Sequence, residues 1–145
     1  MYTVCTLNQN KDFKRLYFKG KSFVSPVVVV YVMKNKSNNI RYGITTSKKV
    51  GKACKRNRAK RVINVAFYSL LPDISNGYDF VFVARAKTPF VKSDYVLRCM
   101  SKQLKQAGVL LWNARLFVLL NFIKNVFLLI LVLVVNTSQL VLNML

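Results

Sequence analysis

The stretch KKVGKACKRNRAKR, residues 48–61, constrains the fold of this chain more than any other segment. Eight of its fourteen residues are Lys or Arg, and none is acidic. An apolar stripe with the i, i+3, i+4, i+7 spacing of a half-buried helix begins within it and runs beyond it. The segment therefore predicts an amphipathic helix that packs one face on a core and turns its cations to solvent. The stripe consists of Ala59, Val62, Ile63, Ala66, Phe67 and Leu70.

The charge of the whole chain is strongly one-sided. The chain has 24 Lys and Arg against 4 Asp and Glu, which gives a formal net charge of +20. A solvated helix face normally mixes both signs, yet no acid occurs between Asp12 and Asp73. An unpaired positive charge of this size attracts polyanions. RNA, DNA and anionic lipid are therefore the partners that the composition favours.

The residues that are missing argue against a catalytic role for the protein itself. The chain has no His and no Glu, and its four Asp are scattered. This composition disfavours a paired-carboxylate hydrolase and a two-metal site built by the protein. Cys5, Cys54 and Cys99 show no CxxC spacing, which disfavours zinc and a disulfide framework and fits a reducing compartment such as the cytoplasm. We therefore expect no cofactor bound by the protein alone.

Three strands are predicted from runs of β-branched and aromatic residues, at 22–33, 40–47 and 78–86. The first two are separated by the polar run KNKSNN and are predicted to pair as a hairpin. With the helices, the element order is α-β-β-α-β-α. This order predicts an α+β domain in which helices pack on a small mixed sheet.

Two further helices follow from caps and periodicity. The first is predicted to start at a cap formed by Asn8 or Asn10 and to end at Gly20. The last is predicted to be capped by Ser93 and closed by Gly108. The apolar residues of the last helix that should face inward are Val96, Leu97, Met100 and Leu104.

The composition changes abruptly near residue 108. The segment 109–145 is apolar, but its unbroken apolar run, 126–135, is shorter than the roughly 20 residues that cross a bilayer. A longer span would include Lys124, and a lysine inside hydrocarbon is costly. We predict one domain at 1–108 and an apolar helical tail at 109–145. Two interpretations of the tail stay open: a membrane anchor, or an accident of the reading frame.

Three aromatic residues form a second candidate feature. Phe13 and Tyr17 lie one turn apart on the first predicted helix, and Tyr31 lies on the first predicted strand. If this helix packs over the sheet, the rings can line a groove in which unpaired bases stack. Ordinary core packing explains the same pattern, and periodicity alone leaves both interpretations open.

The basic stretch resembles the signature region of the bacterial ribonuclease P protein component. The resemblance rests on TSKKVGKACKRNRAKR, with the triplet Arg56-Asn57-Arg58 followed by Lys60 and Arg61. DFKRLYFKG upstream and DFVFVARA downstream stand where that family places them. The resemblance covers about residues 5–108 and leaves the apolar tail unexplained.

The resemblance implies a fold and a role. The fold is a small domain of ribosomal-S5-like topology with a left-handed βαβ crossover. The role is that of an accessory subunit in an endoribonuclease that removes the 5′ leader of precursor tRNA, in which a large RNA with bound magnesium is the catalyst. The protein is expected to bind that RNA and the leader.

The resemblance also implies which residues do this. A basic loop and the following helix are expected to face the catalytic RNA, with Asn57 as the one candidate for contact with RNA-bound magnesium, and three rings are expected to form the leader cleft. Tyr17 stands where Phe is common, and Asn64 where many members carry Arg. The RNA-binding set is Ser47, Lys48, Lys49, Lys52, Arg56, Asn57, Arg58, Lys60 and Arg61, and the leader-cleft set is Phe13, Tyr17 and Tyr31.

An alternative from another class of protein is a membrane-associated basic protein. Its tail would serve as an anchor and its cations would bind anionic lipid. The two hypotheses are compatible, because a cytoplasmic ribonuclease P protein can also be tethered to a membrane by its tail.

Overall fold

The computed structural model describes residues 3–110. In this part of the chain the strands form a five-stranded mixed sheet in the order β1-β4-β5-β3-β2. The strands are β1 (Val4–Thr6), β2 (Lys21–Val24), β3 (Val28–Lys34), β4 (Ile40–Thr46) and β5 (Tyr78–Ala84). The helices are α1 (Asn10–Lys19), α2 (Ala53–Leu70) and α3 (Ser93–Gln106), and short 3-10 turns are η1 (Lys48–Val50), η2 (Leu71–Asp73) and η3 (Thr88–Phe90).

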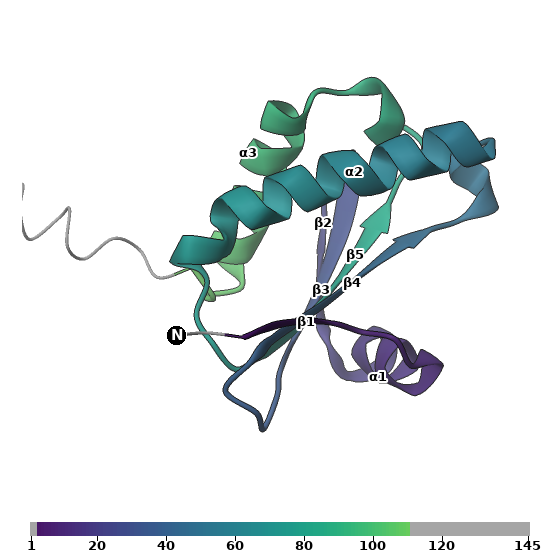
Figure 1. Ribbon diagram of the computed structural model, residues 1–145. Coiled ribbons are helices and arrows are strands. Elements are labelled where there is room, and N and C mark those ends of the chain that lie inside the picture. The colour runs from purple at the N-terminus through teal and green to yellow at the C-terminus, as the bar shows by residue number, and fades with distance from the viewer. Residues whose placement is uncertain (1–2, 111–145) are drawn as a thin grey trace, which may run out of the picture. The chain divides into compact units, whose positions relative to one another are not determined.

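One face of the sheet carries the larger core. Alternate residues of β3 point to it because successive side chains of a strand point to opposite faces, and Val28, Val30 and Val32 are buried there. Phe80 and Phe82 of β5 join them. Figure 1 shows α2 and α3 on this side of the sheet and α1 on the other. This face therefore supplies most of the apolar burial.

The other face is covered by α1 alone among the described helices. Leu7, Leu16 and Val81 form a small buried cluster there. Phe13 and Tyr31 pack against this cluster and stay partly exposed. This face thus keeps its aromatic residues near the surface.

The predicted hairpin between 22–33 and 40–47 is wrong. The first segment is two strands, β2 and β3, which pair with each other around a turn at Ser25. The Oγ of Ser25 accepts a hydrogen bond from the backbone N–H of Val28 at 3.1 Å and so closes the turn. The central strand β5 then lies between β3 and β4, antiparallel to the first and parallel to the second.

The parallel strands β4 and β5 are joined through α2, as the predicted βαβ crossover requires. The left-handedness of this crossover remains a prediction. The short parallel edge strand β1 was missed, since its three residues carry no pattern of their own. The three α-helices predicted within residues 3–110 are confirmed, and they end at Gly20, Leu70 and just before Gly108, whose φ is 70°. The predicted N-caps of the first and last of these helices are wrong. Gln9 and Lys92 occupy the N-cap positions of α1 and α3, without a capping hydrogen bond from their side chains. The predicted tail helix at 109–145 lies almost wholly outside the described residues.

Candidate nucleic-acid interface

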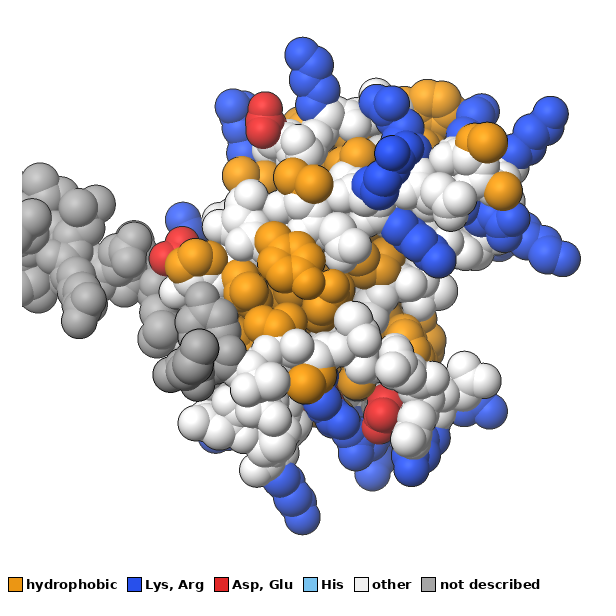
Figure 2. Space-filling view, in the orientation of Figure 1, with side chains coloured by type: hydrophobic (Ala, Val, Ile, Leu, Met, Phe, Trp, Pro, Cys, Tyr) orange, Lys and Arg blue, Asp and Glu red, His pale blue; other side chains and the backbone are white. Residues whose placement is uncertain are grey.

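The long helix α2 separates apolar from charged residues as the sequence predicted. Ala59, Ile63, Ala66, Phe67 and Leu70 are buried against the sheet, and Val62 is partly buried. The candidate cations lie on the remaining surface, where Arg58, Lys60 and Arg61 are exposed together with Asn57. Figure 2 shows Lys and Arg side chains gathered around the N-terminal half of α2. We call Arg56, Asn57, Arg58, Lys60 and Arg61 the helix patch.

Arg56 is the half-buried member of the helix patch. Its Nε is buried, and no group within residues 3–110 accepts a hydrogen bond from it. A buried donor without a partner is costly. An acceptor supplied by a bound partner would remove that cost.

The loop before α2 exposes cations because one apolar residue anchors it. Val50 of η1 is buried, whereas Ser47, Lys48 and Lys49 on one side of it and Lys52 on the other are exposed. Gly51 has φ of 124°, a backbone conformation that residues with a side chain rarely adopt. This turn directs the chain from the anchor into α2. We call Ser47, Lys48, Lys49 and Lys52 the basic loop.

The cations of the loop and the helix patch have no acidic partners in the described part of the chain. The ion pairs found there involve Arg15 and Arg41 with Asp12 and Asp79. The Lys55 ammonium lies 4.8 Å from the centre of the Phe90 ring, a cation–π contact with a ring that carries no net charge. The positive charge of the loop and patch therefore remains open to an external polyanion.

The structure brings the three predicted aromatic residues together, but in two different environments. Phe13 packs against Gly43, where a Cβ would come within 2.6 Å of two atoms of its ring. Tyr17 packs edge-on against Tyr31 at 5.0 Å between ring centres. Tyr17 also shares a 2.9 Å hydrogen bond between its hydroxyl and that of Thr45, and it is 37% exposed. Phe13 thus belongs to the packing under α1, and the two tyrosines form its accessible edge.

A buried acid that the sequence did not single out holds the same face together. Asp79 of β5 is fully buried, and its carboxylate accepts hydrogen bonds from both Nε and Nη2 of Arg41. Arg15 of α1 donates to it at 3.3 Å, and the side-chain amide of Asn35 donates at 2.7 Å. The hydrogen bond to Asp79 raises the pKa of Arg41 above its ordinary value. An acid between apolar strand residues was the only sequence feature that could have indicated this cluster.

Metal ligation by the protein has no candidate among residues 3–110. No group of three or more His, Cys, Asp or Glu side chains comes together there. Asn57 is exposed on α2 and is free to face a partner.

The fold and the sequence agree on a family. Residues 1–108 match the family Ribonuclease P. The chain belongs to the ribonuclease P protein family. The ribonuclease P protein component of Clostridioides difficile is 46% identical over 83 residues, which cover 57% of this chain and 73% of that relative. The component of Clostridium botulinum strain Loch Maree is 38% identical over 104 residues, which cover 71% and 94%.

Solved ribonuclease P proteins share the fold. The RNase P protein of Staphylococcus aureus has a TM-score of 0.65 at 33% identity, covering 72% of this chain and 96% of that one. The protein from Thermotoga maritima has a TM-score of 0.63 at 30% identity, covering 70% and 96%. The predicted α+β fold is therefore confirmed.

Membership in the ribonuclease P family confirms the main functional prediction, an accessory subunit of a tRNA-processing endoribonuclease. It implies partnership with the ribonuclease P RNA and with precursor tRNA. The membrane hypothesis receives no support from these relatives. Within residues 3–110, none of the helices combines the length and apolar character that crossing a bilayer requires.

Proposed function

We propose that the helix patch and the basic loop dock on the catalytic RNA of ribonuclease P. The observation that carries this proposal is the set of cations around α2 without acidic partners in the described chain. Arg58 and Arg61 can each hold a phosphate with two parallel hydrogen bonds. The backbone N–H groups at the start of α2 favour anions as well, which suits the position of Lys52 as its N-cap residue.

The chemistry of phosphodiester cleavage belongs in this proposal to the RNA and its magnesium. The protein contributes binding and charge neutralisation at the RNA surface. Asn57, exposed beside Arg58, can accept a hydrogen bond from water of an RNA-bound magnesium ion. Cytoplasmic location and the division into a domain at 1–108 and a tail at 109–145 remain part of the proposal.

The leader of precursor tRNA is proposed to cross the face under α1. Tyr17 and Tyr31 form a partly exposed aromatic pair there, and single-stranded bases stack on such rings. Thr45, the hydrogen-bond partner of Tyr17, precedes the basic loop by two residues. Bases on the tyrosines would therefore lie beside cations that can take the adjoining phosphates. Phe13 packs against the same small buried cluster as Tyr31 and is also partly exposed, so it remains part of the proposed cleft.

The helix patch is tested with the full chain carrying Arg58→Ala and Lys60→Ala. The matched control, Lys34→Ala with Lys36→Ala, removes the same charge from exposed positions at the β3–β4 turn. We measure affinity for an in vitro transcribed ribonuclease P RNA over a range of salt concentrations. Each lost phosphate contact should flatten the slope of log K against log salt by about 0.9, so a change of about two is expected for the patch variant. Equal slopes in the two variants would refute the assignment.

The tail needs a separate experiment in the native cell. Mass spectrometry of the native C-terminus shows whether residues 109–145 are present, and membrane fractionation shows whether the protein follows the bilayer. A native chain that ends near residue 108 would remove the anchor interpretation.

A further inference from the structure

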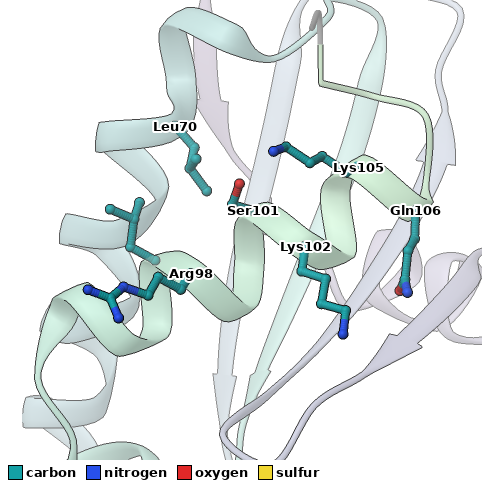
Figure 3. A pocket seen from close by; sticks show the side chains of 7 residues that line it. Leu70, Arg98, Ser101, Lys102, Lys105 and Gln106 are labelled. Atoms are coloured by element: carbon teal, nitrogen blue, oxygen red, sulfur yellow. The ribbon is translucent and has the colours of Figure 1, made fainter.

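Two grooves lie along the boundary between α2 and α3. The first, of about 480 Å³, includes Arg58 and Arg61 of the helix patch together with Lys92 and Asp94 before and at the start of α3. The second, of about 540 Å³, has Leu70 on the α2 side and Arg98, Ser101 and other residues of α3 on the opposite side (Figure 3). The second groove is lined by Leu70, Leu97, Arg98, Ser101, Lys102, Lys105 and Gln106.

The two grooves follow one another along α3. Asp94 lines the first, and Arg98, Ser101 and Lys105 line the second. These four residues are three or four positions apart, which places them on one face of the helix in successive turns. The helix patch therefore borders the first of two successive grooves, together called the furrow, that follow α3. Neither the signature motif nor the proposed docking assigns a role to this helix. We call Arg98, Lys102 and Lys105 the α3 cations.

The α3 cations give the second groove the chemistry of a phosphate site. All three are exposed, no acid lines this groove, and the described chain forms no ion pair with them. In Figure 3 Lys105 extends past Ser101 toward Leu70, whereas Lys102 points to the other side of α3 and Arg98 points away from Ser101. The wall made by Leu70 and Leu97 is apolar and can pack against sugar rings or the aliphatic stems of the cations.

We propose that the α3 cations form a second contact with the phosphodiester backbone of RNA, continuous with the helix patch. This inference rests on the proposed docking of the helix patch on the catalytic RNA. Arg98 and Lys105 are about 10 Å apart along the helix axis, at roughly 1.5 Å per residue. Along the axis of a DNA duplex each strand carries a phosphate about every 3.4 Å, so a double helix of similar rise presents about three phosphates per strand over that length. An RNA strand can enter this groove, whereas a planar bilayer would first meet the protruding surfaces on either side of it.

The test uses the full chain with Arg98→Gln, Lys102→Gln and Lys105→Gln. Glutamine keeps much of the stem and has a helix propensity close to that of Lys and Arg. The control carries Lys19→Gln, Lys21→Gln and Lys34→Gln, three exposed lysines that line another groove of about 330 Å³ at the β2–β3 edge. Both variants lose the same charge, and only the first loses it from the furrow. Unchanged circular dichroism melting curves establish that both fold.

Affinity for a transcribed ribonuclease P RNA is measured against salt for the wild type and both variants. We expect the furrow variant to flatten the slope by about two to three and the control by less than about one. Equal changes in both variants would mean that bulk charge alone acts, and would overturn the inference. Loss of binding to vesicles of phosphatidylserine and phosphatidylcholine with unchanged RNA affinity would overturn it as well.

The result separates this inference from the function on which it rests. A wild-type chain that fails to bind the RNA would refute the proposed docking itself. A wild type that binds, with a slope that responds to Arg58→Ala and Lys60→Ala but not to the furrow variant, would refute the α3 contact alone.

Discussion

The two faces of the sheet differ in how much helix covers them. The 18 residues of α2 and the 14 of α3 enclose one face, and the 10 residues of α1 cover the other. Phe67 of α2 and Phe80 and Phe82 of β5 are fully buried between the first pair of helices and the sheet, whereas the cluster between α1 and the sheet has three buried residues. A fully covered face stabilises the domain, and a partly covered face leaves rings available to a ligand. The fold therefore separates the main source of stability from the face that is proposed to bind the leader.

The two sides of the sheet also differ in whether their cations have acidic partners. On the α1 side, Arg15 and Arg41 are neutralised by Asp12 and Asp79. On the α2 side, the helix patch is left without such partners in the described chain. The cations that hold the structure together are thus distinct from those that are proposed to bind RNA.

The largest effect is expected from Phe67→Ala on the fully covered face. Phe67 packs against Tyr42 and Phe82 at 4.5 and 5.2 Å between ring centres. The cavity should lower the free energy of unfolding by about 4 kcal/mol, as measured by urea denaturation. Val65→Ala, at an exposed position of the same helix, should change it by less than about 0.5 kcal/mol. Similar losses in both variants would contradict the assignment of this face as the main core.

The next effect tests the buried acid under α1. Asp79→Asn removes the charge that Arg41 and Arg15 share, and should lower the free energy of unfolding by about 3 kcal/mol. Asp94→Asn is the control, because Asp94 is exposed and forms no ion pair in the described chain. If both substitutions are equally mild in urea denaturation, the cluster does not hold α1 to the sheet.

A smaller effect should separate leader binding from stability. Tyr31→Ala should weaken binding of precursor tRNA about tenfold and leave mature tRNA nearly unchanged, since one stacked base contributes about 1–3 kcal/mol. Met33→Ala, two residues along the same face of β3, controls for lost packing. The measurement is the affinity of the holoenzyme for precursor tRNA and for mature tRNA. Equal weakening of both affinities would mean that Tyr31 has a purely structural role.

The smallest effect concerns Tyr42, which faces the main core. Burial, with a 3.2 Å hydrogen bond to the hydroxyl of Tyr68, raises the pKa of Tyr42 to about 12. The unfolded value is about 10, so the phenol stabilises the fold fully below pH 10 and loses this contribution as pH rises to 12. Urea denaturation between pH 9 and 11.5 should therefore show a shallower loss of stability for Tyr42→Phe than for the wild type. A steeper or equal loss would contradict the shift.

The sequence predicted α2 well because one periodic stripe determines both its length and its buried face. It could not predict the strand order, since the pairing of β3 with β5 depends on the whole sheet and on the crossover through α2. Gln103 shows the same limit in a side chain. It is buried in the inner face of α3 and donates from Nε2 to the carbonyl oxygens of Phe23 at 2.7 Å and Val28 at 3.1 Å. No local pattern indicates that a polar residue belongs there.

The candidate site likewise has one part that the sequence could predict and another part that it could not. The helix patch and the basic loop were predictable because uniform charge on a helical spacing needs no knowledge of tertiary contacts. The partners of Asp79 come from residues 15, 35 and 41, so their meeting is set by topology alone. The sequence could not indicate the α3 cations as a site, because only the packing of α3 beside α2 makes these three residues the lining of a groove.

The position of β5 in the sheet has a consequence for the synthesis of the chain. When residues up to 46 have been made, two separate strand pairs can exist, β2 with β3 and β1 with β4. Neither pair contacts the other until β5 is made, because β5 alone bridges them. The helix α2, with its exposed cations, is therefore synthesised before the sheet on which it packs can form completely. A nascent chain that stops short of residue 84 is expected to remain sensitive to protease throughout, and one that passes it gains its protection in a single step.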